Sequence, residues 1–288
     1  MTSPTPDPAP LAAHAHRLND GTELPAVGFG TYPLKGDDGI AAIESALRTG
    51  YRLIDSAVNY ENEREVGEAL RRSEVPRGQV RLATKIPGRF HAHDLALRSL
   101  ADSAERLGVE QIDVALIHWP NPSRGLYREA WRALVRAQQE GLVRTIGVSN
   151  FTPAHLARVI DDTGVVPALN QVELHPYFPQ EELRAEHRRL GVLTQAWSPL
   201  GKDPVPFDEP AVAQAAEAHG TTPGQVVLRW HLQLGSMPVP KAASPERQRA
   251  NLDLDAVELS DDEVAAITAL ARTDGRRFDG DPDTHEEM

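Results

Sequence analysis

The sequence predicts an α/β fold, a single (β/α)8 TIM barrel with an N-terminal β-hairpin. Short apolar strands recur roughly every 25–30 residues, each followed by a segment of helical spacing, eight times after the hairpin. The 288 residues, 40% of them hydrophobic, suffice for one large core. No linker interrupts the alternation between Gly50 and Leu270. We therefore expect residues 15–288 to form the barrel with its C-terminal loop, and the proline-rich residues 1–14 to be a disordered tail.

Composition restricts the class of protein. The chain has no cysteine, which excludes disulfides, thiolate catalysis and cysteine metal sites, and suits a reducing cytoplasm. Its formal charge of −12 argues against a general affinity for nucleic acid or for a membrane surface. No apolar run approaches the roughly 18 residues of a membrane span, and the start lacks the pattern of a signal peptide. We expect a soluble cytoplasmic monomer with no nucleic-acid or membrane partner.

The ordered chain is expected to begin with a hairpin. Residues 16–19 and 22–27 flank Asp20-Gly21, a strong hairpin signal. The next stretch, residues 28–33, contains a GxG pattern but no third glycine at the required offset. Pro33 also interrupts a smooth passage from strand to helix, so a Rossmann phosphate loop is not expected here.

From residue 38 onward, strands and helices alternate. Ile40, Ile43 and Leu47 repeat at helical spacing, and Gly50 occupies the position of a C-terminal cap. Apolar runs predict strands at residues 51–54, 80–86, 114–117, 143–148, within 165–174, 192–197 and 237–239. Helical spacing and caps predict helices at 63–72, around 97–107, around 131–141, from Thr152-Pro153 onward, at 180–190, up to 234 with a start at Thr222-Pro223, and after the capping box Ser260-Asp261-Asp262-Glu263.

Chemistry in such a barrel belongs just after the C-terminal ends of the strands. Alone, each polar residue there has an ordinary explanation: a solvated lysine, a packed histidine, or an aspartate that caps a helix. On one barrel face they would converge on a common mouth, which predicts a catalytic site. Seven consecutive strand ends carry polar or aromatic residues: Asp55 with Tyr60, Lys85, His118, Ser149-Asn150, Asn170-Gln171 with Glu173 and His175, Trp197 to Gly201, and Lys241.

The chemistry of these residues suits a proton transfer to a carbonyl oxygen. A free tyrosine has a pKa of about 10, and a nearby Lys85 ammonium would lower the pKa of Tyr60, with Asp55 orienting Lys85. His118 could hydrogen-bond a substrate carbonyl. No side chain delivers a hydride, so carbonyl reduction requires a nicotinamide. Trp197 offers a face for that ring, and hydrogen bonds to its carboxamide are expected from Ser149, Asn150 and Gln171.

Long motifs over nearly the whole chain resemble the aldo-keto reductases, and most closely bacterial members of the 2,5-diketo-D-gluconate reductase type. They are residues 50–67, 114–120, 147–151, 170–176 and 197–201. The resemblance implies a catalytic tetrad of Asp55, Tyr60, Lys85 and His118, with Tyr60 as general acid and NADPH across the mouth. It implies a substrate pocket at Tyr32, Tyr60, His118 and Trp119. The cofactor residues it implies are Thr31, Tyr32, Asp55, Ser149, Asn150, Gln171, Trp197, Ser198, Leu200, Lys241, Arg247 and Asn251.

Segment 240–251 resembles the clamp that holds the adenosine phosphate in that family. Lys241 and Arg247 correspond to the residues that grip the 2′-phosphate, and Asn251 to one that meets the adenine. Two positions depart from the pattern, because Ala242 replaces a common serine and Ala250 a common glutamate. A neutral hydrogen bond contributes about 1 kcal/mol, less than a charged phosphate contact, so NADPH is expected over NADH.

The sequence therefore predicts an NADPH-dependent reductase of aldehydes or ketones. Two alternatives stay open: a Schiff-base aldolase using Lys85, and an NADPH-binding regulatory or sensor subunit with little turnover. The histidine pairs His14/His16 and His91/His93 lack carboxylates behind them, so no metal site is expected. Arg276-Arg277, in an acidic tail, would favour anionic substrates if it reached over the mouth.

Overall fold

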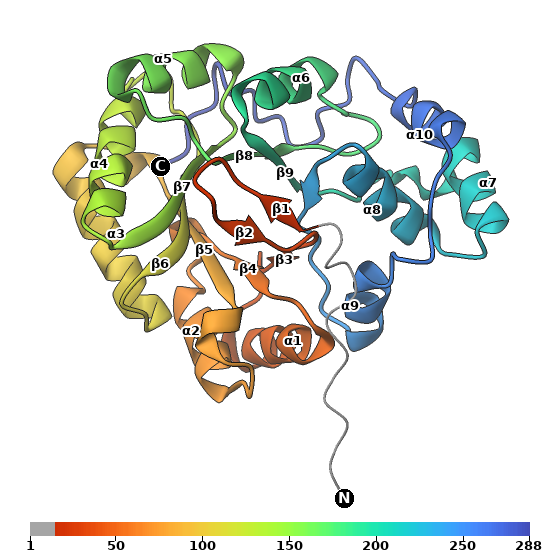
Figure 1. The fold of residues 1–288 in the computed structure, drawn as a ribbon, viewed down its shortest axis with the longest axis horizontal. Coiled ribbons are helices and arrows are strands. Elements are labelled where there is room, and N and C mark those ends of the chain that lie inside the picture. The colour runs from red at the N-terminus through yellow and green to blue at the C-terminus, as the bar shows by residue number, and fades with distance from the viewer. Residues whose placement is uncertain (1–14) are drawn as a thin grey trace, which may run out of the picture.

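Eight parallel strands follow one another in sequence order around a barrel in the computed structural model, which describes residues 15–288. The two ends of the sheet meet, since Gly28 N donates to Pro238 O at 3.0 Å and Gly30 N to Pro240 O at 3.1 Å. The predicted (β/α)8 barrel is thus confirmed (Figure 1). Its strands are β3 (Phe29–Gly30), β4 (Leu53–Asp55), β5 (Arg81–Ile86), β6 (Ile112–Ile117), β7 (Val143–Ser149), β8 (Leu169–Glu173), β9 (Leu193–Trp197) and β10 (Met237–Pro238).

Helices surround the strands, as the alternation predicted. Thr152, Thr222 and Ser260 each form a capping box at the start of a helix. Such caps satisfy backbone N–H groups that have no partner inside the helix. The helices are α1 (Gly36–Thr49), α2 (Glu63–Arg72), α3 (His93–Leu107), α4 (Tyr127–Gln139), α5 (Pro153–Thr163), α6 (Glu181–Leu190), α7 (Pro210–Ala218), α8 (Pro223–Gln233), α9 (Pro245–Leu252) and α10 (Asp261–Thr268).

Two elements were not predicted from the spacing of apolar residues. Strand β3 has only two residues, too few to show an apolar pattern, yet it is the first strand of the barrel. Helix α9 carries little apolar spacing, because its sequence is PERQRANL. The sequence nonetheless marks where α9 begins, because the Ser244 side chain accepts a hydrogen bond from Arg247 N and a proline occupies the first turn. Cap residues alone would have located this helix.

The predicted hairpin is present, formed by β1 (His16–Arg17) and β2 (Glu23–Leu24), and lies across the front of the barrel in Figure 1. It is fixed to the N-terminal ends of the strands: Thr145 Oγ1 donates to Thr22 Oγ1 at 2.9 Å, and Asn19 Nδ2 donates to Pro167 O at 3.1 Å. The hairpin therefore closes one end of the barrel. The disordered tail predicted for residues 1–14, including His14, lies outside the described residues.

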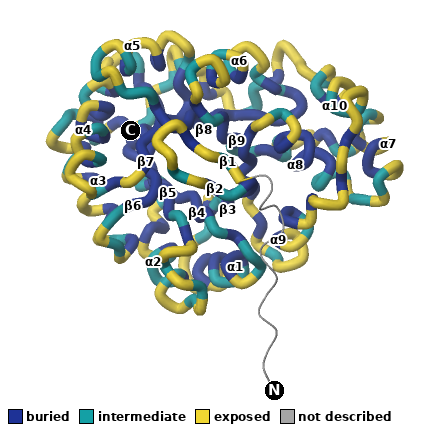
Figure 2. Tube along the Cα trace, in the orientation of Figure 1, coloured by how far each residue is buried: buried dark blue, intermediate teal, exposed yellow. Residues whose placement is uncertain are grey.

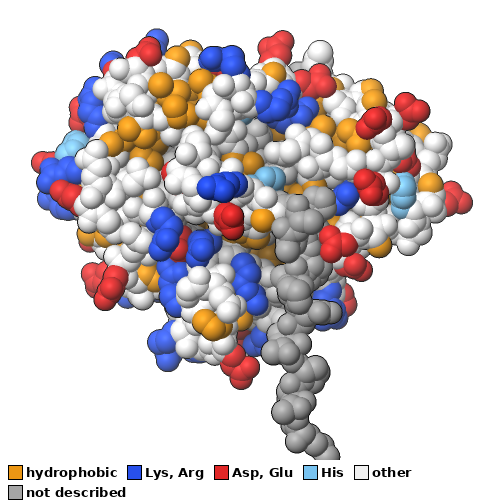
Figure 3. All heavy atoms as spheres, in the orientation of Figure 1, with side chains coloured by type: hydrophobic (Ala, Val, Ile, Leu, Met, Phe, Trp, Pro, Cys, Tyr) orange, Lys and Arg blue, Asp and Glu red, His pale blue; other side chains and the backbone are white. Residues whose placement is uncertain are grey.

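The hydrophobic core has two layers, because side chains alternate between the inner and outer faces of each strand. The strands of the barrel are mostly dark blue in Figure 2, whereas the hairpin and the outer surfaces of the helices are largely yellow and teal. Charged side chains of both signs are spread over the hairpin face (Figure 3). None of the described helices is long and apolar enough to cross a membrane. Leu18 and Leu24 of the hairpin pack in the inner layer with Leu53, Val114, Leu169 and Met237.

Candidate active site

A pocket of about 360 Å³ opens where the C-terminal ends of the strands meet. A larger hollow of about 690 Å³ lies between α1, α2 and α3, but none of the predicted site residues lines it. The smaller pocket is identified as the site because the reactive side chains at the strand ends line it, although its volume is the lower of the two. The predicted residues that line the smaller pocket are Thr31, Tyr32, Asp55, Tyr60, His118, Trp119, Ser149, Asn150, Gln171, Trp197, Ser198 and Lys241.

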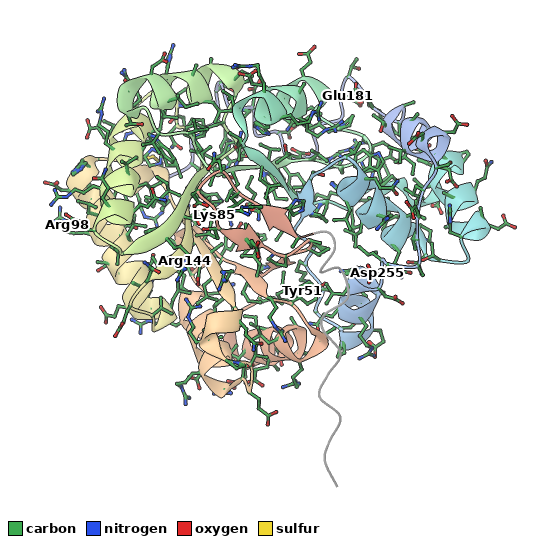
Figure 4. The ribbon with its side chains drawn as sticks, in the orientation of Figure 1. Tyr51, Lys85, Arg98, Arg144, Glu181 and Asp255 are labelled. Carbon is green, nitrogen blue, oxygen red and sulfur yellow. The ribbon has the colours of Figure 1, made fainter. Side chains whose placement is uncertain are left out.

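Lys85 lies beneath the pocket, fully buried inside the ring of strands (Figure 4). Its Nζ donates to Asp55 Oδ2 at 2.7 Å, to Ser56 O at 2.8 Å and to Tyr60 OH at 3.3 Å. Burial lowers the pKa of Lys85, but the Asp55 carboxylate and the Tyr60 hydroxyl outweigh burial, so the pKa lies above its ordinary value. Lys85 is therefore held as a cation that points at the phenol.

Tyr60 follows β4 on the 3-10 turn η2 (Val58–Tyr60), and its ring forms one wall of the pocket. The sequence predicted that Lys85 lowers the pKa of this phenol, and Lys85 does lower it, but the net shift is upward. Burial raises the pKa of Tyr60 and outweighs the opposing effect of Lys85, so the pKa lies above its ordinary value. The phenol consequently carries its proton at neutral pH, as a general acid must.

Asp55 is held from three sides. Its Oδ2 accepts from Lys85, its Oδ1 accepts from Gln171 Nε2 at 2.9 Å, and its backbone oxygen accepts from Thr31 Oγ1 at 2.8 Å. Gln171 Nε2 also donates to Gln195 Oε1 at 2.5 Å. Gln171, predicted to meet a carboxamide, thus orients Asp55 from across the barrel, a role that no local signal in the sequence indicated.

Trp197 is fixed by a chain of hydrogen bonds along the pocket floor. Its Nε1 donates to Asn150 Oδ1 at 2.8 Å, and Asn150 Nδ2 donates to His118 O at 3.0 Å and to Ser149 Oγ at 3.1 Å. Asn150 and Ser198 have φ angles of 61° and 48°, left-handed conformations that side chains adopt at a cost. Such geometry next to a pocket is typical of a site organised for a ligand.

The tail (residues 273–288) crosses the pocket and contributes residues that the sequence did not single out. Phe278 lines the pocket and packs edge-on against Trp197, with ring centroids 4.9 Å apart. The ring of His285 lies 4.2 Å from that of Trp119. Glu287 Oε1 lies 2.8 Å from His118 Nδ1. These contacts join segments far apart in the chain, so sequence patterns could not reveal them.

Arg276 and Arg277 do not reach the pocket lining. The Arg276 guanidinium lies 4.9 Å from the ring of Phe178, and that of Arg277 lies 5.1 Å from the ring of Tyr177. The backbone N–H of Arg277 donates to the buried Glu173 at 2.7 Å. Both side chains thus lie against aromatic rings beside α6 and outside the pocket lining, so the condition under which they would favour anionic substrates is not met in this structure.

The remaining predicted cofactor residues lie after β9, after β10 and on α9. Lys241 links the pocket to α9, where Arg247 is exposed. Asn251 is buried beside the hydroxyl of Tyr51, whose pKa is raised by burial and lowered in part by their hydrogen bond. Leu200 is partly buried against the core.

His91 and His93 do not form a site with other ligands. His91 is buried, whereas His93 Nδ1 lies 3.0 Å from Asp94 Oδ1. Within residues 15–288, no three histidine or carboxylate side chains gather as metal ligands would.

Comparisons with known proteins agree with this geometry. The family model described as "Aldo/keto reductase family" matches residues 26–205 and 208–272. The chain is 54% identical to 2,5-diketo-D-gluconic acid reductase B of Corynebacterium sp. (strain SHS752001), covering 94% of this chain and 97% of that protein. It is 40% identical to methylglyoxal reductase DkgA of Escherichia coli (strain K12), covering 93% and 96%.

Solved structures show the same relationship. A mutant of Gox0644, solved in complex with NADPH, superposes with a TM-score of 0.90 at 39% identity, covering 94% of this chain and 98% of that one. The residues that the family model matches include every strand of the barrel and all the residues that line the pocket except Phe278. This chain belongs to the aldo/keto reductase family.

Proposed function

We propose that the protein reduces aldehyde or ketone carbonyls to alcohols, using NADPH, with Tyr60 as the proton donor. One observation carries the proposal: the Lys85 ammonium contacts both Asp55 and the Tyr60 hydroxyl at the floor of an aromatic pocket. Membership of the aldo/keto reductase family supports it, as do the reductase names of its relatives and the NADPH bound to Gox0644.

The residues present fit a nicotinamide cofactor. The pocket combines the indole face of Trp197 with the polar side chains of Ser149, Asn150 and Gln171, which suit a ring bearing a carboxamide. When bound, NADPH supplies the hydride that no side chain can supply. We assign Trp197 to the nicotinamide, Lys241 and Arg247 to the 2′-phosphate, and Asn251 to the adenine. The remaining contacts would come from Thr31, Tyr32, Asp55, Ser198 and Leu200.

The side chains would act on the carbonyl oxygen. Tyr60, whose pKa is raised, keeps its proton until charge develops on that oxygen, and then donates it. The Lys85 cation stabilises the phenolate that remains, and Asp55 keeps Lys85 aimed at it. His118 is assigned to orient the carbonyl, with Tyr32 and Trp119 shaping the pocket around the substrate.

The geometry disfavours a Schiff-base aldolase. Imine formation requires a neutral amine, but the Asp55 carboxylate and the Tyr60 hydroxyl hold the pKa of Lys85 above its ordinary value despite its burial. Lys85 Nζ also donates to Ser56 O, so with Asp55 and Tyr60 it has three hydrogen-bond acceptors, which matches the three hydrogens of an ammonium group. Borohydride in the presence of a ketone should therefore leave Lys85 unmodified, as mass spectrometry would report.

We further assign the protein to the cytoplasm as a monomer that binds small carbonyl compounds and no nucleic acid. The absence of cysteine and the net charge of −12 support these assignments. Size-exclusion chromatography with light scattering would test whether the protein is a monomer. A mass in solution twice that of one chain would contradict the assignment.

A panel of carbonyl substrates tests the function most directly. We expect NADPH consumption, followed by absorbance, with formation of one alcohol per NADPH and slower turnover with NADH. Aldehydes, α-dicarbonyls and sugar-derived ketones should be included, because the relatives reduce compounds of these kinds by name. Binding of NADPH without turnover on any carbonyl would favour the sensor alternative instead.

A further inference from the structure

The tail residue Glu287 lies directly behind His118. Its Oε1 is 2.8 Å from His118 Nδ1, and the two side chains are only 17% and 12% exposed. His118 lines the pocket whereas Glu287 does not, so Glu287 contacts the ring from outside the pocket lining. Neither the sequence motifs nor the proposed mechanism uses this acid.

Two asparagines hold Glu287 in place. Asn59 Nδ2 donates to Glu287 Oε1 at 2.7 Å, and Asn121 Nδ2 donates to the backbone oxygen of Glu287. Asn59 precedes the proton donor Tyr60, and Asn121 lies two residues after Trp119. Glu287 is therefore bonded to both loops that carry the chemistry, after β4 and after β6.

The acid is ionised in this position. Burial raises the pKa of Glu287, but the close contact with His118 and its charge, together with the hydrogen bond from Asn59, outweigh burial and bring the pKa below its ordinary value. An ionised carboxylate offers only acceptor oxygens, and the ring nitrogen 2.8 Å away is close to it without being aligned as a hydrogen bond. A hydrogen on that nitrogen would make this contact attractive, whereas a lone pair there would be repelled. That nitrogen is Nδ1 of His118.

We propose that Glu287 is a positioning residue for His118, fixing the orientation of the imidazole and the proton on Nδ1 so that Nε2 faces the substrate. The inference rests on the proposed function. With Nδ1 protonated, neutral His118 presents an acceptor at Nε2 to the alcohol hydroxyl, and doubly protonated His118 presents a donor to the carbonyl oxygen. In both states the carboxylate stays outside the pocket lining.

Three single variants of the full chain test the proposal. Glu287→Ala removes the acceptor, Glu287→Gln keeps an acceptor oxygen at the same reach, and Glu286→Gln is the matched control. Glu286 is exposed and accepts from Ser123 N at 2.7 Å, on the same tail but away from His118. Any general loosening of the tail would be shared by the control.

We expect Glu287→Ala to lower kcat about tenfold, the effect of losing one hydrogen bond to a charged group. Glu287→Gln should recover most of that loss, and Glu286→Gln should stay within about twofold of the unaltered protein. The Kd for NADPH, measured by quenching of tryptophan fluorescence, should be the same in all. Equal kcat in the Glu287→Ala and unaltered proteins would overturn the proposal.

A measurement that needs no turnover separates this inference from the function itself. Long-range ¹H–¹⁵N spectra report which ring nitrogen of a histidine is protonated, and the His118 signals are assigned by their loss in His118→Gln. We expect Nδ1 of His118 to be protonated in the unaltered protein and the tautomers to mix in Glu287→Ala. Protonation at Nε2 alone in the unaltered protein would sink the inference, whereas lack of turnover on any carbonyl would contradict only the proposed function.

Discussion

The ammonium nitrogen of Lys85 lies 3.3 Å from the hydroxyl of Tyr60 and 4.7 Å from the centroid of its ring. Lys85 thus contacts the phenol through its oxygen and through its π face. A cation in this position favours the phenolate, while burial favours the phenol. Burial keeps the proton on Tyr60, and the Lys85 cation stabilises the phenolate once the proton has left.

Replacing Tyr60 by phenylalanine should lower kcat for carbonyl reduction by about 10²- to 10⁴-fold, the usual contribution of a positioned general acid. NADPH affinity should change little, because the ring remains. Tyr127→Phe is the matched control: Tyr127 is buried and its hydroxyl has no partner in the structure, so removing that oxygen should leave turnover intact. Steady-state NADPH absorbance measures both, and a Tyr60→Phe enzyme at full speed would refute the assignment.

Asp55 and Lys85 should depend on each other for stability. Lys85→Met leaves a buried carboxylate without its cation, and we expect a loss of about 3–5 kcal/mol in the free energy of unfolding. Adding Asp55→Asn should restore much of that loss, since neither charge then remains. The single variant Asp55→Asn completes the cycle, and activity should stay low in all three variants. Urea unfolding measures the cycle. Additive losses in the double variant would show that the pair is not coupled.

Much of the barrel was predictable because its signals are local. Helix α2 has the bounds that its spacing predicted, Glu63–Arg72, and the Thr152, Thr222 and Ser260 caps start helices as expected. Caps and periodicity act within one or two turns, so one sequence suffices to read them. A two-residue strand such as β3 has no period, and it exists because β4 and β10 flank it.

The site was predictable to the extent that the barrel brings strand ends together. Asp55, Tyr60 and Lys85 meet as the strand order requires. The direction of the pKa shift of Tyr60 was not predictable, because it depends on how deeply the ring is buried. The positions of Glu287 and Phe278 in the site were not predictable for another reason. The paths of loops and of the tail are set by contacts with distant residues, which leave no periodic signal in the sequence.

Buried neutral histidines should make the protein sensitive to acid. Burial lowers the pKa of His91 to about 4, that of His187 to about 4 and that of His231 to about 3, all from 6.5. Below pH 6.5 the unfolded chain binds protons that the folded one does not. The contribution of these histidines to the free energy of unfolding is therefore full above pH 6.5. It is lost as pH falls, by about 2 kcal/mol per histidine at pH 5.

The variant His91→Gln isolates one of these contributions. Measured against the unaltered protein, its deficit in unfolding free energy should shrink by about 2 kcal/mol between pH 8 and pH 5, because the variant has one fewer proton to take up on unfolding. At pH 8 all three histidines are neutral in both states, so the value there gives the packing cost of the substitution alone. A deficit that does not change with pH would contradict the buried neutral state of His91.

Arg247 should set the preference for NADPH over NADH. It is exposed on α9, near Lys241, and a guanidinium there can pair with the 2′-phosphate, which NADH lacks. We expect Arg247→Ala to raise the Kd for NADPH about tenfold or more, and to leave that for NADH unchanged. Arg249→Ala is the control, since Arg249 lies on the same helix and pairs loosely with Glu246 at 3.8 Å. Equal weakening for both cofactors would refute the phosphate role.

Replacing Arg276 and Arg277 by alanine should leave KM for carboxylated carbonyl substrates unchanged. Both guanidinium groups stack on aromatic rings beside α6, outside the pocket lining, so neither charge faces the substrate. Because those contacts and the Arg276 bond to Gly280 O hold the tail, the midpoint of thermal unfolding should fall. A neutral carbonyl compound of the same length is the control substrate. A rise in KM for the carboxylated substrate alone would show that the tail brings these arginines over the mouth when substrate binds.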